Sequence, residues 1–175
     1  MKWYLIVPVI ILLFAACKKA DTGVPMPPFT HTGQDILACK INGTVMIAKG
    51  GKGMSFFPSD IVYISQDTQK HVTIDGKNTT STGDEILMSF YYDRLQNVHT
   101  INLFASGSTQ ASYYNNYKSV NGTCFCYHST PVNGGSLTID YDDGITIAGR
   151  FAFDAADSSG NIVHITEGQF DIARF

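Results

Sequence analysis

The residues best suited to bind a metal ion form a short cysteine and histidine cluster in the last third of the chain. Cys124, Cys126 and His128 occupy alternate positions. On a β-strand, side chains two positions apart point from the same face, so two thiolates and an imidazole would lie together. That ligand set suits zinc or copper. A fourth ligand would come from one of the other histidines, His31, His71, His99 or His164.

The same thiols have a competing use in a disulfide. The chain has four cysteines, and three remain if Cys17 is lipidated. In an oxidising envelope, three thiols allow one bridge within the chain and leave one thiol over. We expect Cys39 to pair with Cys124 or Cys126, and either pairing is open. The C-x-C spacing differs from that of common zinc pairs, so a disulfide or core packing is favoured over a metal site, and we expect no cofactor.

Tyrosines gather in residues 106–122, the longest stretch without a regular pattern. Tyr113, Tyr114 and Tyr117 lie there among several asparagines. Aromatic rings and amides on a loop can stack on sugars or contact a protein partner. The alternative is that the tyrosines fold back to cover an open edge of the sheet. The stretch is therefore a candidate binding site for a glycan or an envelope protein.

Aspartates cluster at two predicted turns. Asp140, Asp142 and Asp143 flank the first turn, and Asp154 and Asp157 border the second. Carboxylates on adjacent loops can hold Ca²⁺. Aspartate is also favoured in turns because it hydrogen-bonds the local backbone, and we favour that interpretation.

Motifs of common enzymes are absent from the chain. It has no G-x-S-x-G elbow, no H-E-x-x-H pair and no Walker loop. Glu167 and Asp171 are four positions apart on a predicted strand, where we expect them to face solvent or to support the fold. Scattered serines, histidines and aspartates indicate no catalysis without geometry. We therefore expect a protein that is not an enzyme.

The elements that must position these residues are β-strands. From residue 36 onward, apolar and polar residues alternate, as in Leu37, Cys39 and Ile41, and no segment shows a helical period. Asn42-Gly43 marks a tight hairpin, and Gly168 marks a bulge or break in the last strand or pair. About ten short strands with regular turns predict an all-β domain over residues 36–175. We expect a single antiparallel β-sandwich, Ig-like or related, or a barrel-like variant.

The beginning of the chain carries a targeting signal. Lys2 is followed by an apolar run over residues 5–14, and Ala15-Ala16-Cys17 ends it. This pattern is typical of a secretory signal peptide, because the apolar run is too short to span a bilayer. Residues 14–17 resemble the bacterial lipoprotein box, although Phe14 stands where leucine is commonest. The resemblance implies that residues 1–16 are removed and that Cys17 is acylated, inserting the chain into membrane lipid.

Residues 17–35 predict a flexible tether between the lipid and the domain. The segment holds three prolines and no periodicity. A net charge of −3 supplies no basic patch, which excludes nucleic acid as a partner and leaves the acyl chains to hold the membrane. We expect an outer-membrane location, on either the periplasmic face or the cell surface.

Residues 135–139, 147–153 and 163–172 form an ordered set with the A-x-x-x-N-G segment at residues 38–43. The set resembles small outer-membrane lipoproteins of Bacteroidota with a β-sandwich domain of unknown function. The resemblance implies a fold and an envelope location, and brings no site residues. We expect a membrane-anchored, non-catalytic binding or structural module. The alternative is a metal-binding or enzymatic β-domain that uses Cys124, Cys126 and His128.

Overall fold

The computed structural model describes residues 23–50, 61–79, 83–93, 100–104, 109–115 and 125–174. These residues form eleven strands and no helix. The strands are β1 (Ile36–Ile41), β2 (Thr44–Lys49), β3 (Ile61–Gln66), β4 (His71–Lys77), β5 (Glu85–Tyr91), β6 (Thr100–Asn102), β7 (Gln110–Asn115), β8 (Phe125–His128), β9 (Gly135–Asp142), β10 (Thr146–Ala156) and β11 (Ile162–Ala173). In the described part of the chain, no helix has the length and apolarity needed to cross a membrane.

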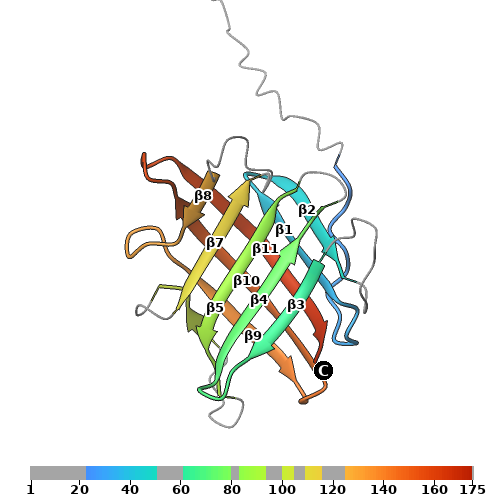
Figure 1. Ribbon diagram of the computed structural model, residues 1–175. Coiled ribbons are helices and arrows are strands. Elements are labelled where there is room, and N and C mark those ends of the chain that lie inside the picture. The colour runs from blue at the N-terminus through green and yellow to red at the C-terminus, as the bar shows by residue number, and fades with distance from the viewer. Residues whose placement is uncertain are drawn as a thin grey trace, which may run out of the picture.

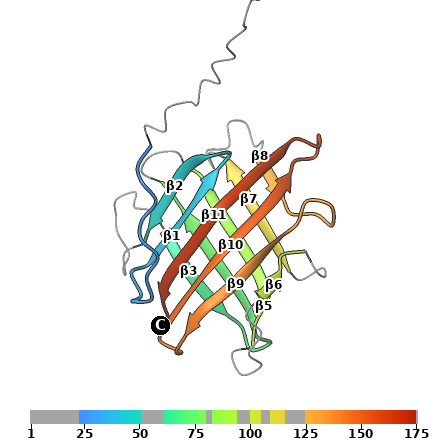
Figure 2. The same cartoon turned by 180° about the vertical axis from the view of Figure 1, so that it is seen from behind.

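All strands belong to one antiparallel sheet that curls into a half-barrel. The main path runs β2-β1-β11-β10-β8-β7-β5-β4-β3. Strands β3, β4, β5 and β7 form one wall, and β9, β10 and β11 form the opposite wall (Figures 1 and 2). The predicted all-β antiparallel class is confirmed, and of the two expected arrangements the continuous sheet adopts the barrel-like one.

One edge of β10 is shared by two strands. β9 pairs with β10 along most of its length, from Gly135 opposite Phe153 to Asp142 opposite Ile147. β8 pairs with β10 only where Ala156 faces His128. The sheet therefore forks at β10, and one branch continues to β7 while the other ends at β6.

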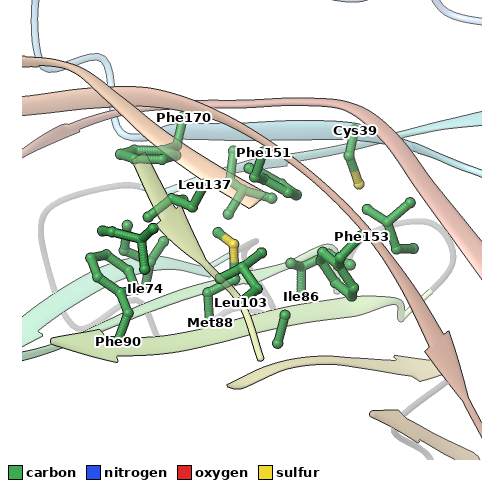
Figure 3. Close-up of a cluster of buried hydrophobic side chains, with 14 of the residues drawn as sticks. Cys39, Ile74, Ile86, Met88, Phe90, Leu103, Leu137, Phe151, Phe153 and Phe170 are labelled. Atoms are coloured by element: carbon green, nitrogen blue, oxygen red, sulfur yellow. The ribbon is translucent and has the colours of Figure 1, made fainter. Parts of the chain in front are cut away.

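The core fills the interior of the curl. The alternation seen in the sequence places every second side chain inward, because neighbouring strand residues point to opposite faces. Phe151, Phe153 and Phe170 from one wall meet Ile74 and the neighbouring apolar residues of the other (Figure 3). Because the inward apolar side chains of the two walls pack against each other, each wall covers the apolar face of the other.

The packing of β4 against β1 depends on a glycine. A Cβ atom built at Gly76 of β4 would lie only 2.7 Å from Leu37 Cδ1 of β1. Any side chain at position 76 would therefore push the walls apart, because well-packed interiors leave no room for an added methyl group.

The structure corrects the boundary of the predicted tether. Residues 27–35, which we call the strap, lie against the outer face of the sheet before β1 begins (Figure 2). The Gln169 side chain donates a hydrogen bond of 2.6 Å to the Pro27 carbonyl oxygen. The prediction of a flexible tether up to residue 35 is wrong for the strap, because its polar groups have partners on a distant strand.

Candidate functional site

A hollow on the described surface lies on the outer face of β9, β10 and β11. Its volume is about 590 Å³, and it opens widely to solvent. It is lined by Ser136, Thr138, Arg150, Phe151, Ala152, Glu167, Gly168 and Gln169. Three adjacent strands thus contribute side chains to one site, as expected for outward positions that lie beside one another in a sheet.

A bulge in β11 forms the hollow. The register between β10 and β11 shifts between Phe151 and Phe153, and Glu167 adopts a positive φ of 51°. Gly168 lies opposite Phe151, and a Cβ atom there would come within 2.5 Å of the Phe151 ring. The bulge redirects the Glu167 side chain, and the missing side chain at Gly168 leaves space. A bulge with a strained residue is a common device beside functional sites.

Two ion pairs border the hollow. The Arg150 guanidinium donates from Nε and Nη2 to the two carboxylate oxygens of Asp140, at 3.0 and 2.5 Å. Lys40 Nζ lies 2.8 Å from Glu167 Oε1. The hydrogen bonds that Arg150 donates to Asp140 raise the pKa of Arg150 further above its ordinary value. The charges of both pairs cancel, so the border of the hollow carries no net charge.

Several polar atoms of the hollow keep hydrogen-bonding capacity for a ligand. Among the described residues, Arg150 Nη1, the second carboxylate oxygen of Glu167 and the Gln169 Oε1 atom have no hydrogen-bond partner. The hydroxyl groups of Ser136 and Thr138 are likewise without a partner in this part of the structure. The hollow therefore presents fixed donors beside fixed acceptors, with hydroxyl groups that can serve as either.

The predicted tyrosine site is wrong for Tyr113. Tyr113 and Tyr114 belong to β7 rather than to an irregular loop, so they point to opposite faces. Tyr113 is 4% exposed, and its hydroxyl donates to Asp84 Oδ1 at 2.8 Å. Burial and this bond raise the pKa of Tyr113. Tyr114 lies on the outer face with its ring edge-on to His128, and Tyr117 lies outside the described residues.

The predicted disulfide from Cys39 is wrong. Cys39 is a free thiol in the core, pointing inward from β1 (Figure 3). Burial, assisted by the charge of Asp84, raises the pKa of Cys39 to about 12. Cys126 is disulfide-bonded. Cys124, the other predicted partner of Cys39, lies outside the described residues.

One of the two thiolates of the predicted metal site, Cys126, is not present as a thiolate. A disulfide sulfur is not a thiolate, so Cys126 cannot ligate in the way predicted. The His128 Nδ1 atom instead lies 2.8 Å from the hydroxyl of Ser112. In the part of the chain that the structure describes, no three histidine, cysteine or acidic side chains gather around a possible ion.

The contact between Ser112 and His128 does not make a nucleophile and its base. Ser112 is buried, and in the described residues no carboxylate contacts the His128 ring. A serine nucleophile needs an accessible hydroxyl and an oriented base. The arrangement instead links β7 to β8 across the outer face.

Two of the aspartates at the turns, Asp143 and Asp157, act locally, as favoured from the sequence. Asp140 and Asp154 instead pair with Arg150 and His164, and Asp142 accepts both from the Gly144 N–H and from Arg174. Asp143 accepts hydrogen bonds from the backbone N–H groups of Ile145 and Thr146, which lower its pKa. Asp157 accepts from Asn161 in the same way, and its pKa is lowered too. These contacts are the turn hydrogen bonds that make aspartate common at such positions.

Most residues of the hollow carry no recognisable signal in the sequence. Ser136, Thr138 and Arg150 are outward positions of regular strands, where polar residues are expected and attract no notice. Glu167 was singled out only for its spacing from Asp171. The one signal that pointed here was Gly168, predicted to interrupt the last strand, because an interruption in a regular strand marks a bulge.

No protein-family model matches the chain, and neither a curated protein nor a solved structure matches it.

Proposed function

We propose that this chain is a lipid-anchored protein of the outer membrane that binds carbohydrate in the hollow and catalyses no reaction. The observation that carries the proposal is the set of unpartnered donors and acceptors on three adjacent strands. A sugar hydroxyl both donates and accepts, so a chain of sugars matches a surface that offers both kinds of group. Specific binding sites use a few such placed polar groups for orientation.

The charges at the border favour an uncharged ligand. Arg150 is neutralised by Asp140, and Glu167 is neutralised by Lys40. A phosphate or a polyanion would be attracted by unpaired cations, as on anion-binding surfaces. The hollow instead offers hydrogen bonds without net charge. Neutral glycans fit that chemistry better than acidic peptides or nucleic acids.

The binding test compares the hollow with a matched pair elsewhere on the outer face. The full chain, purified in detergent, would be titrated with maltohexaose, cellohexaose, xylohexaose and mannohexaose. Ser136→Ala with Thr138→Val removes two hydroxyl groups from the hollow. Ser89→Ala with Thr73→Val removes two outer-face hydroxyls that contact each other at 3.3 Å on β4 and β5.

We expect the hollow variant to lose about tenfold or more in affinity, since each lost hydrogen bond contributes about 1 kcal/mol. The matched variant should bind as the unmodified chain does. Binding of none of the sugars, or equal affinity in both variants, would refute the proposal.

The anchoring part of the proposal has a separate test. Cys17→Ser should move the protein from the membrane fraction to the soluble fraction, because the acylation site is gone. Cys39→Ser is the control, since that thiol is buried in the fold. Mass spectrometry of the mature amino terminus should find acyl groups on Cys17. An unacylated terminus would remove the basis for the assigned location.

A further inference from the structure

The strap is held to the sheet by one buried carboxylate near the end of β11. Asp171 is 4% exposed. It accepts hydrogen bonds from the Thr30 hydroxyl at 2.5 Å, the Thr32 backbone N–H at 3.0 Å and the Gly33 backbone N–H at 2.7 Å. All three donors belong to the strap. Hydrogen bonds to a charged acceptor are stronger than neutral ones, so Asp171 is the main attachment of the strap.

A second carboxylate fixes the end of the strap. Asp35 is buried, has a positive φ of 53°, and accepts a hydrogen bond of 2.9 Å from the Ala173 backbone N–H. Its carbonyl oxygen accepts from the Gly50 N–H at 2.7 Å. The strap is therefore tied at its end as well as in its middle, and it enters β1 in a defined direction.

The strap contacts two residues that line the hollow. The Pro27 carbonyl oxygen accepts a hydrogen bond from Gln169 Nε2 at 2.6 Å. The Arg150 Cζ atom lies 5.6 Å from the centre of the Phe29 ring, in a cation–π contact. The Phe29 ring in turn packs edge-on against His31 at 4.9 Å. Two of the long side chains of the hollow, Arg150 and Gln169, are thus each held from one side by the strap.

We propose that the strap is part of the glycan-binding site and that Asp171 is a positioning residue for it, which rests on the proposed function above. Asp171 lies outside the set of residues that line the hollow. It acts by holding Pro27 and Phe29 in place. Pro27 then holds Gln169, and Phe29 holds Arg150. In these positions Gln169 Oε1 and Arg150 Nη1 stay unpartnered among the described residues, so a ligand can bind them.

The physical reason is preorganisation. Arginine and glutamine side chains have many rotamers, and ordering them on binding lowers the affinity. In this structure Arg150 is already fixed between Asp140 and Phe29, and Gln169 is fixed by Pro27. If the strap leaves the sheet, both side chains regain their freedom while the strands that carry them stay in place. Affinity should therefore fall although the sheet remains folded.

The chain offers a matched pair of variants for the test. Thr30→Val removes the hydroxyl group that donates a hydrogen bond to Asp171. Thr32→Val, two positions on, changes an exposed side chain whose residue contacts Asp171 only through its backbone N–H. Asp171→Asn is the stronger variant, because asparagine keeps only one acceptor oxygen and its NH2 group would face at least one of the strap donors. All three would be made in the full chain, purified in detergent.

Three measurements separate the outcomes. Amide hydrogen exchange at Thr32 and Gly33 reports whether the strap is attached. Titration with the neutral hexasaccharides named above reports affinity, and urea unfolding reports the stability of the sheet. For Thr30→Val we expect faster exchange at both amides and about a tenfold weaker affinity, with the sheet still folded. Thr32→Val should leave exchange and affinity unchanged.

The inference is overturned if Thr30→Val or Asp171→Asn frees the two amides while affinity stays the same. It is also overturned if affinity falls while the amides remain protected, or if neither variant releases them. If Asp171→Asn does not fold, Thr30→Val still decides. Should the unmodified chain bind none of the sugars, the proposed function fails and the inference fails with it, whatever the exchange data show.

Discussion

The hydroxyl of Thr30 and the carboxylate of Asp171 lie 2.5 Å apart although 141 residues separate them in the chain. This contact joins the segment before the first strand to the last strand. Thr30→Val should lower the free energy of unfolding by about 1–2 kcal/mol, because Asp171 loses one of three donors and a hydrogen bond to a charged group is lost. Urea denaturation measures the change. Thr32→Val should stay within about 0.5 kcal/mol of the unmodified chain, and equal losses in both would contradict the assignment.

Gly168 should be the most sensitive glycine of the hollow. In Gly168→Ala, the new methyl group would lie 2.5 Å from the Phe151 ring and 2.6 Å from its carbonyl oxygen. We expect a loss of about 2–3 kcal/mol in unfolding free energy, the range for overpacking. Gly160→Ala is the control, because Gly160 has a φ of +83° and no atom near its Cβ position. It should lose only about 1 kcal/mol. A smaller loss at position 168 than at 160 would show that the bulge adjusts easily.

Asp75 should make the fold less stable as the pH rises. One carboxylate oxygen of Asp75 is buried and has no hydrogen-bond partner in the described structure. Burial, and next the negative charge of Glu85, raise its pKa from 3.8 to about 6, although Lys77 acts in the opposite direction. The folded state therefore binds this proton more tightly than the unfolded state. The contribution of Asp75 to the free energy of unfolding falls between about pH 4 and pH 6 and stays low above that range.

Asp75→Asn should remove this dependence. At pH 7 the variant should be more stable than the unmodified chain by about 1 kcal/mol, a figure reduced from the full shift because the group is partly exposed. Well below pH 3.8 the two should be nearly equal, since Asp75 is then protonated in both the folded and the unfolded state. Thermal unfolding across this range measures the difference. A variant that is less stable at pH 7 would show that the ionised carboxylate is stabilising.

The Cys39 thiol should react only when the protein unfolds. It is fully buried, and its pKa is raised to about 12, so almost no thiolate forms near neutral pH. Incubation of the folded chain with iodoacetamide should leave Cys39 unmodified, while modification in urea should follow the unfolding curve. Peptide mapping identifies the labelled residue. Labelling of Cys39 under native conditions would indicate local opening of β1.

Local patterns predicted the elements of the fold well. Asn42-Gly43 forms the expected tight hairpin, with a positive φ at both residues and Ile41 paired with Thr44. The alternation over residues 145–153 became the long strand β10, whose inward positions are apolar. Such features depend on steric preferences and on a period of two residues, which neighbouring positions alone express.

The predictions that the structure overturns concern features that local patterns do not encode. Residues 110–115 lack clean alternation, yet they pair with β5 and β8 to form β7. The strap is polar and rich in proline, which predicts flexibility, but its partner Asp171 lies more than a hundred positions away. Cys39 was expected in a disulfide, but its inward position on β1 places the thiol in the core. In each case packing between segments far apart in the chain decided the outcome.

The sequence by itself determined that this protein is all-β and antiparallel, and where most turns occur, because side-chain alternation and turn chemistry are encoded by adjacent residues. Only the tertiary structure decided that the sheet curls into one half-barrel, that the strap lies on β11, and that Arg150, Glu167 and Gln169 border one hollow. Those arrangements follow from strand order and from a bulge register. Both are set by packing between segments far apart in the chain, and no short stretch of sequence contains that information.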